Sequence, residues 1–300
     1  MQSIWGSSPD NIYAVGHSDE IKGQVWHYDG KQWSSVYIFM GLAYTPNTVF
    51  GFSANDVWIA GGFYGNTSTA DSSLIMHYNG STWRRINAYG GRLIENIWGN
   101  SPDNVWFVGL NGTIFHWNGT SIHPDSLPIR ISKDAMPGYN LSVSGNSSGA
   151  AYFLLSAASG RQDLFKRMQD NWSVIDTNLW GWDRKNVWVS NTNKIYETGA
   201  AGFYWWTGSN WENLLDQFGG FTFGIEALSE DNMFITGWLS PATGNHKALL
   251  YHYNGKDIYL YENLMIDDTD FMDAWSTGSE VFVVGRTHSY PQRSVVLHGK

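Results

Sequence analysis

Two carboxylates stand out among the side chains that could perform acid-base chemistry. Glu226 lies in Gly224-Ile225-Glu226, where comparable segments carry an aromatic residue, as in Ile4-Trp5 and Ile97-Trp98. A carboxylate in an aromatic slot is costly unless it is paired or protonated. Asp273 precedes Ala274-Trp275 in the corresponding C-terminal segment. These two residues are candidate catalytic groups of a polysaccharide hydrolase or lyase, and a hydrolase needs two carboxyl groups roughly 5–9.5 Å apart. A structural carboxylate with a local partner is the alternative interpretation of Glu226.

A short acidic run offers the oxygen ligands that calcium prefers. It comprises Asp267, Asp268 and Asp270 and continues to Asp273. The run lacks the glycine spacing of an EF-hand loop, so a solvated acidic loop is the competing interpretation. We therefore expect no cofactor and keep calcium as the alternative.

The histidines fall into two groups. Four recur just before an Asn-Gly or Asp-Gly turn or its equivalent, and we assign them to the scaffold because they belong to separate repeats and cannot converge on one ion: His27, His77, His116 and His252. Others lie in or beside segments of variable length, among them His17, His246 and His288. Rings and forked guanidinium donors in such segments suit sugars or peptides, and we predict these ligand-binding candidates: Tyr64, Arg92, Tyr139, Arg161, Trp238, His246, His288, Tyr290 and Arg293.

The elements that position these residues come from a repeat. The segment from Ile4 to Gly16 returns almost unchanged from Ile97 to Gly109. Looser copies run from Val49 to Gly61, Val143 to Leu155, Leu179 to Asn191, Ile225 to Gly237 and Ala274 to Gly285. The apolar residue after each Asp-Asn turn spaces these units by 36–48 residues, close to the length of a four-stranded propeller blade.

Each repeat contains the signals of four strands. The first is the Ile-Trp-Gly segment, the second follows the Asp-Asn turn, the third ends in an aromatic pair before Asn-Gly or Asp-Gly, and the fourth carries a Trp, as at Trp33, Trp83, Trp172 and Trp211. We predict an all-β, seven-bladed β-propeller of four-stranded antiparallel blades that forms a single domain over residues 1–300. No fourth-strand signal follows the last repeat, so we expect the last blade to have three strands or the chain to be a fragment of a longer protein, and favour the fragment.

The loop lengths divide the expected propeller into two faces. Connections between strands one and two and between three and four are short and repeated, whereas the remaining connections vary in length. Binding residues concentrate on variable loops held by a rigid scaffold, so we place any site on the variable-loop face, at the channel mouth. One position before each Ile-Trp-Gly is small or polar and should line the channel, where it either binds ordered water or contributes to a ligand site: Ser3, Thr48, Asn96, Ser142, Asn178, Gly224 and Asp273.

The order of these signals, from Ile12-Tyr13-Ala14-Val15-Gly16 through Trp26-His27-Tyr28-Asp29-Gly30 to Trp33, resembles the kelch repeat. It departs from that pattern in its usually single glycines and its shorter Tyr-to-Trp spacing. The chain looks closer to bacterial propellers built from Trp-Gly-Ser-Ser-Pro-Asp-Asn-Val-Trp repeats. This resemblance covers the whole chain and implies the fold, but propellers serve many functions. The absence of cysteine argues against a copper site that uses a Tyr–Cys crosslink.

Composition narrows the functional classes. The net charge of −9, without a basic cluster, argues against nucleic-acid binding. There is no apolar stretch of 18 residues and no signal peptide in this chain, while abundant Ser, Asn, Gly, Thr and Trp suggest an extracellular or cell-envelope protein. We predict a monomeric, non-catalytic binding propeller that recognises a glycan or a protein through its variable-loop face. The alternatives are the polysaccharide-degrading enzyme and a structural module of a larger surface protein.

Overall fold

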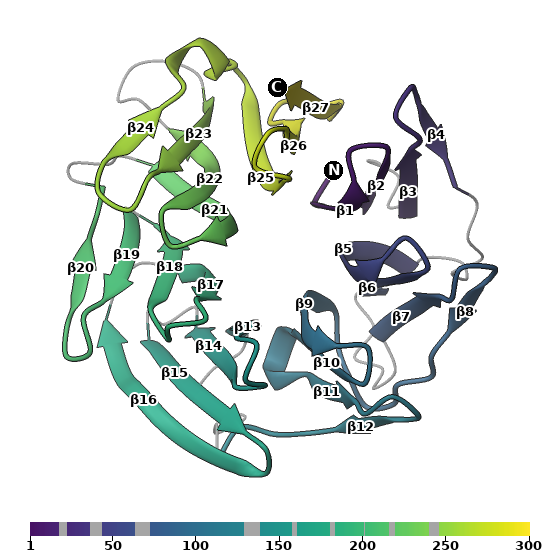
Figure 1. The fold of residues 1–300 in the computed structure, drawn as a ribbon, viewed down its shortest axis with the longest axis vertical. Coiled ribbons are helices and arrows are strands. Elements are labelled where there is room, and N and C mark those ends of the chain that lie inside the picture. The colour runs from purple at the N-terminus through teal and green to yellow at the C-terminus, as the bar shows by residue number, and fades with distance from the viewer. Residues whose placement is uncertain are drawn as a thin grey trace.

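The protein is a ring of seven antiparallel sheets, which confirms the predicted seven-bladed β-propeller (Figure 1). The computed structural model describes residues 1–17, 23–36, 44–63, 73–128, 139–157, 161–180, 184–200, 202–215, 220–239 and 246–300, and only the backbone at 139, 178–180 and 184–185. Sheet order follows the chain, so each blade is a meander whose first strand lies innermost. The two ends of the chain lie at adjacent blades in Figure 1.

The first three blades hold twelve strands. Blade 1 comprises β1 (Ser3–Ser8), β2 (Asn11–His17), β3 (Gly23–Tyr28) and β4 (Trp33–Ser35). Blade 2 comprises β5 (Tyr44–Ser53), β6 (Asp56–Phe63), β7 (Ser73–Tyr78) and β8 (Trp83–Arg85). Blade 3 comprises β9 (Ile94–Ser101), β10 (Asn104–Gly109), β11 (Ile114–Trp117) and β12 (Ile122–Pro124), with the short 3₁₀ segment η1 (Leu110–Gly112).

The remaining blades complete the ring. Blade 4 comprises β13 (Tyr139–Gly145), β14 (Ala151–Ala157), β15 (Arg161–Met168) and β16 (Asn171–Trp180). Blade 5 comprises β17 (Arg184–Val189), β18 (Ile195–Gly199), β19 (Gly202–Trp206) and β20 (Trp211–Asn213). Blade 6 comprises β21 (Gly220–Ser229), β22 (Asn232–Leu239), β23 (Lys247–Tyr253) and β24 (Ile258–Leu260), followed by η2 (Glu262–Leu264). Blade 7 has three strands among the described residues: β25 (Thr269–Ser276), β26 (Val281–Thr287) and β27 (Ser294–Gly299).

The sequence assignment of blade 5 was wrong by one strand. Leu179 and Trp180, predicted to begin a first strand, pair with Gln162 and Arg161 of β15 and therefore end the outer strand of blade 4. Val187, predicted on a second strand, lies on the innermost strand β17. The cause is that Trp180-Gly181 imitates the Ile-Trp-Gly pattern at the end of a long outer strand. The channel position of blade 5 is consequently Asn186 and not Asn178.

Alignment of the innermost strands of the seven blades explains why Trp and Gly recur together. A Cβ added to Gly51 would lie 2.7 Å from the Trp5 ring, one on Gly145 2.5 Å from Trp98, and one on Gly6 2.9 Å from Trp275. Each Trp comes from the blade before its glycine, and the last of these contacts joins blade 7 to blade 1. The indole of the preceding blade occupies the space of a side chain at all three positions, and at Gly51 and Gly145 a backbone carbonyl of the same blade does so as well. The repeated Trp and Gly therefore pack aromatic rings across the interfaces between neighbouring blades, which we call seams.

Where the aromatic residue is missing, a polar contact replaces it. Ser144 and Glu226 occupy the Trp position in blades 4 and 6, and the residues facing them are Val189 and Ser276 instead of glycine. The backbone N–H of Val189 donates to Ser144 Oγ at 3.1 Å, and that of Ser276 donates to Glu226 Oε1 at 3.0 Å. Glu226 thus has the local structural partner that one of the two interpretations required.

Polar channel positions accept hydrogen bonds from the next blade, a role that was not predicted from the sequence. Backbone N–H groups donate across four seams, from Val49 to Ser3 Oγ (3.3 Å), from Val143 to Asn96 Oδ1 (2.9 Å), from Val187 to Ser142 Oγ (3.3 Å) and from Ile4 to Asp273 Oδ2 (3.1 Å). The bond from Ile4 closes the ring between blades 7 and 1. No helix among the described residues is long and apolar enough to cross a membrane.

The Trp–Gly seam can be tested between blades 7 and 1. Gly6→Val should lower the free energy of unfolding by about 1–3 kcal/mol, because the new side chain collides with the Trp275 indole. Adding Trp275→Ser, which reproduces the Ser144–Val189 pair, should relieve part of this loss, so the double variant is more stable than the sum of the single effects predicts. Urea unfolding of all three variants measures the coupling.

Gly299→Val is the matched control, because a Cβ there has nothing within 4 Å. It should change stability little. Strict additivity of Gly6→Val and Trp275→Ser would show that the indole is not what excludes a side chain at position 6.

Candidate functional site

A histidine on the third strand is part of the repeat. In five blades it pairs across the ladder with an aromatic residue of the second strand, and its ring bonds to an acidic or amide side chain at or beside the preceding turn: His27 to Asn11 (2.6 Å), His77 to Asp56 (2.8 Å), His116 to Asn104 (2.7 Å), His252 to Asn232 (2.9 Å) and His298 to Glu280 (2.6 Å). The first four confirm the predicted scaffold role, and the structure adds His298.

Blades 4 and 5 lack this histidine. Lys166 takes the position in blade 4, with its ammonium group 5.3 Å from the centre of the Tyr152 ring. Trp205 takes it in blade 5, opposite Tyr196. The indole N–H of Trp205 is buried without a hydrogen-bond partner among the described residues. An unpaired buried donor costs about 1–3 kcal/mol, a cost that the repeated histidine avoids through its bond to a residue at or beside the turn.

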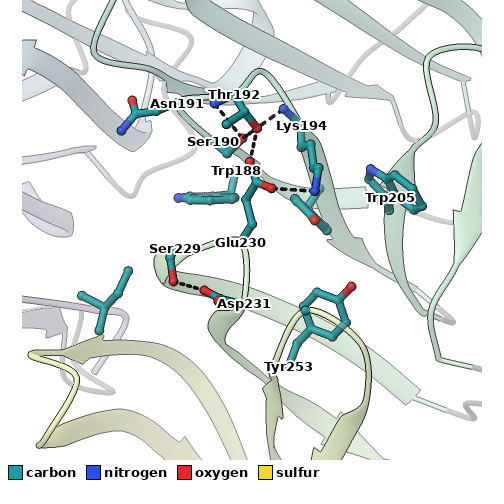
Figure 2. Close-up of a pocket in the computed structure, with 13 residues that line it drawn as sticks. Trp188, Ser190, Asn191, Thr192, Lys194, Trp205, Ser229, Glu230, Asp231 and Tyr253 are labelled. Carbon is teal, nitrogen blue, oxygen red and sulfur yellow. Dashed lines mark hydrogen bonds and ion pairs between the residues drawn. The ribbon is translucent and has the colours of Figure 1, made fainter.

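A cavity of about 570 Å³ opens beside Trp205, between blades 5 and 6. Trp188 lies on one side of it and Trp205 on the other, with Tyr253 below and the Lys194–Glu230 pair above in the view of Figure 2. Its polar rim comes from the β17–β18 and β21–β22 turns. The cavity therefore lies on the face of short turns, opposite the face where we expected a site. Its size is in the range of small-molecule sites.

Two of the charged groups of the cavity, Lys194 and Glu230, are paired with each other. Lys194 Nζ lies 2.6 Å from Glu230 Oε2, and the Thr192 hydroxyl donates to Glu230 Oε1. Desolvation alone would raise the pKa of Glu230, but hydrogen bonds from Lys194, Ser190 and Thr192 outweigh it and lower the pKa to about 2. Glu230 is consequently ionised at neutral pH and is no proton donor.

The wall formed by the β17–β18 turn is held from blade 4. Asn193, in a left-handed conformation with φ 66°, accepts hydrogen bonds from Asn146 Nδ2 at 2.9 Å and from the Tyr152 hydroxyl at 3.2 Å. The backbone N–H of Ser147 donates to Asn191 Oδ1 at 2.9 Å. These contacts fix the turn before any ligand arrives, which lowers the entropic cost of binding.

A second cavity of about 750 Å³ lies on the axis of the ring and is lined mainly by the inner strands. Glu226 and Asp273 both face it. Burial raises the pKa of Glu226 to about 8, against the hydrogen bond from Ser276 and with a further contribution from Asp273. Burial raises the pKa of Asp273 to about 6, although hydrogen bonds from Ile4, Ser3 and Ala274 lower it. Both carboxylates hold neighbouring blades or strands while keeping partial contact with the channel.

Three of the predicted ligand-binding residues meet on the variable-loop face. The rings of Trp238 and His246 stack with centres 4.1 Å apart, and those of His246 and His288 at 4.0 Å. Phe221 extends the stack beyond Trp238. Asp270 of the acidic run joins the two histidines, with Nδ1–carboxylate distances of 3.6 Å to each. Tyr290, 83 % exposed, and Arg293 lie on the same β26–β27 loop as His288.

Arg161 and Arg92 do not join this group. Arg161 pairs with the buried Asp163 at 2.9 Å, and Arg92 uses its backbone to bind Ser73 and Thr113. Tyr64 lies outside the described residues, and at Tyr139 only the backbone is described. In the acidic run, Asp267 pairs with Lys247 at 3.4 Å and Asp268 accepts bonds from Ser289.

Sequence reasoning missed Trp188, Trp205 and the Lys194–Glu230 pair. The sequence signal that could have indicated this site is the absence of the repeated histidine from blade 5, where Trp205 stands at the third-strand position. It was hidden by the misplaced first strand of that blade.

No model of a protein family matches the sequence, and no curated protein matches it. Solved structures with the same fold include Ycf48 from Cyanidioschyzon merolae, 15 % identical over 99 % of this chain and 94 % of that one, with a TM-score of 0.67. Ycf48 bound to a D1 peptide is 13 % identical over 96 % and 90 %, with a TM-score of 0.65. A PL25 ulvan lyase bound to an oligosaccharide is 9 % identical over 97 % and 90 %, with a TM-score of 0.63. Identities this low show a shared fold alone.

The raised pKa values of the channel carboxylates predict how stability depends on pH. The folded protein keeps Glu226 protonated up to about pH 8, whereas the unfolded chain loses that proton near 4.5. This contribution is therefore fully present below pH 4.5 and is lost as pH rises through about 8. Glu226→Gln, a neutral mimic of the protonated acid, should remove roughly 3 kcal/mol of the loss between pH 5 and pH 8 in urea unfolding.

Gln at the exposed Glu212 provides the control and should leave the pH profile of the wild type unchanged. If Glu226→Gln also retained the full wild-type profile, Glu226 would be ionised in the folded protein.

Proposed function

We propose that the chain is a non-catalytic binding propeller that holds a sugar of a neutral glycan in the cavity between blades 5 and 6. The observation that carries the proposal is Trp205, which replaces the repeated histidine and forms one wall of the cavity opposite Trp188. Five other blades carry histidine at this position, so the repeat itself does not call for a tryptophan there. A binding surface accounts for it.

The shape and chemistry of the walls support a sugar. A pyranose ring has apolar faces, which stack on indole and phenol rings, and hydroxyl groups at its edge. The cavity provides Trp188, Trp205 and Tyr253 as rings, and its rim carries the polar side chains of Asn191 and Ser229. Aromatic side chains give large contact areas at low conformational cost.

The charges support a neutral ligand. Lys194 is the one cation among the 13 described residues that line the cavity, and Glu230 neutralises it. Asp231 adds a further carboxylate, which accepts a bond from Ser229. A uronate or sulfate would meet a net negative surface, so acidic glycans should bind more weakly.

The alternative function is a polysaccharide hydrolase or lyase in the channel. It is favoured by the raised pKa values of Glu226 and Asp273, since a catalytic acid needs such a shift. Against it, both carboxylates accept backbone hydrogen bonds that join neighbouring blades. Release of reducing or unsaturated ends from a polysaccharide panel, abolished by Glu226→Gln in a folded protein, would favour the enzyme. We expect no release.

The biological setting remains part of the proposal. An extracellular or envelope location agrees with the composition and with a glycan ligand. The Trp-Gly-Ser segments of the chain agree with a kelch-like repeat type. The fold is also seen with a bound peptide in Ycf48 and a bound oligosaccharide in the ulvan lyase, so both ligand classes must be tested.

A glycan array and a peptide array, each probed with wild type and Trp205→Ala, test the proposed function. We expect binding to neutral glycans, weakened about tenfold or more by Trp205→Ala because one stacking wall is lost. Trp206→Ala is the matched control: this residue is next to Trp205 on β19, but it packs on Trp211 and does not line the cavity. Glycan binding unchanged in Trp205→Ala, or binding to peptides alone, would overturn the proposal.

A further inference from the structure

Three side chains from two blades converge on the variable-loop face. His246 lies just before β23 of blade 6, Asp270 on β25 and His288 just after β26 of blade 7. Nδ1 of His246 is 3.6 Å from one carboxylate oxygen of Asp270, and Nδ1 of His288 is 3.6 Å from the other. All three potential ligand atoms lie within 4.8 Å of one another. Two imidazoles thus face the two oxygens of one carboxylate.

One residue holds the two histidines in place. Asp268, in a left-handed conformation with φ 54°, donates its backbone N–H to the carbonyl of His246 at 2.6 Å. Its own carbonyl accepts the N–H of His288 at 2.7 Å. The side chain of Asp268 accepts further hydrogen bonds from the N–H and hydroxyl of Ser289, at 3.0 and 2.6 Å. The backbone around the cluster is therefore preorganised.

The polar atoms at the centre lack the hydrogen bonds that burial demands. The Asp270 side chain is only 6 % exposed. Within the part of the chain that the structure describes, neither Asp270 Oδ1 nor His246 Nδ1 has a hydrogen-bond partner. Buried polar groups are nearly always satisfied, and an exception calls for an explanation such as an ion.

We propose that His246, Asp270 and His288 form a binding site for a transition-metal ion of the Zn²⁺ class, which joins blades 6 and 7. Zn²⁺ binds nitrogen and carboxylate oxygen at about 2.0–2.2 Å, so two ligand atoms of one ion lie at most about 4 Å apart. Both 3.6 Å distances meet this limit, and because all three ligand atoms lie within 4.8 Å of one another, a small side-chain adjustment brings them onto one ion. Three protein ligands leave a fourth tetrahedral position for water or an external ligand.

The donor set selects the metal. Calcium and magnesium take oxygen ligands, whereas two imidazoles with one carboxylate suit zinc and its neighbours. In this proposal a nitrogen-binding ion takes the place of the calcium that was kept as the alternative for the acidic run. Asp267 and Asp268 are not ligands, because the first pairs with Lys247 and the second with Ser289.

Calorimetric titration of chelator-treated protein with Zn²⁺ tests the site. We expect one ion per chain with a Kd of about 1 μM or lower, at least tenfold weaker binding in His288→Ala and in Asp270→Asn, and no comparable binding of Ca²⁺. His288 is 54 % exposed, so its removal should leave the fold intact, as thermal unfolding without metal would show. In wild type, saturating Zn²⁺ should raise the melting temperature by several degrees.

Two variants control for nonspecific binding. His123→Ala removes an exposed histidine outside the cluster, and Asp267→Asn removes a charge of the same acidic run. Both should bind Zn²⁺ as tightly as wild type. Co²⁺ provides a second measurement, since visible absorption bands should appear in wild type and be lost in His288→Ala. Zn²⁺ affinity that is unaffected by His288→Ala and Asp270→Asn, or weaker than about 1 mM in wild type, would overturn the proposal.

Discussion

The seam between neighbouring blades is the constraint on which the rest of the structure depends. Inner strands place aromatic or polar side chains against the next blade. The partner residue lacks a side chain in the Trp–Gly seams, as Gly145 does beside Trp98, and offers a backbone N–H in the polar seams, as Ser276 does to Glu226. The seven seams form a closed ring, so the bond from Ile4 to Asp273 is made only when all of them fit. Rigidity of the ring in turn fixes the turns and loops at its two faces.

The architecture could be predicted from the repeat because the residues that form the seams, an aromatic residue and a glycine, are adjacent in the sequence. Trp5-Gly6 and Trp98-Gly99 each contain an aromatic group for the next blade and a space for the preceding one. The same pattern misled at Trp180-Gly181, since two residues cannot show whether a strand is inner or outer. Contacts between neighbouring blades show which strands are inner. Ser144, for example, stands where other inner strands carry an aromatic residue, and the residue opposite it is Val189 instead of glycine.

The sites were less predictable, for two different reasons. His246, Asp270 and His288 converge because Asp268 ties two loop ends together through its backbone, and no residue type or spacing encodes such a bond. The loop lengths did indicate the face on which these residues lie. Trp205 was missed for a different reason. Aromatic residues are common in this chain, so this one becomes informative only when it is compared with the five histidines at the same register in other blades.

Both sites use departures from the repeat, and the architecture explains why these are tolerated. In a repeat fold each unit contacts only its neighbours, so a substitution alters one or two interfaces and leaves the others intact. The N–H of Trp205, unpaired among the described residues, affects only the surroundings of blade 5. The centre at Asp270, unsatisfied within the same part of the chain, affects only the seam between blades 6 and 7. The Trp–Gly contacts and the five histidines that follow the pattern supply the stability that these two places lack. A ring of near-identical blades can therefore hold distinct binding sites on both faces.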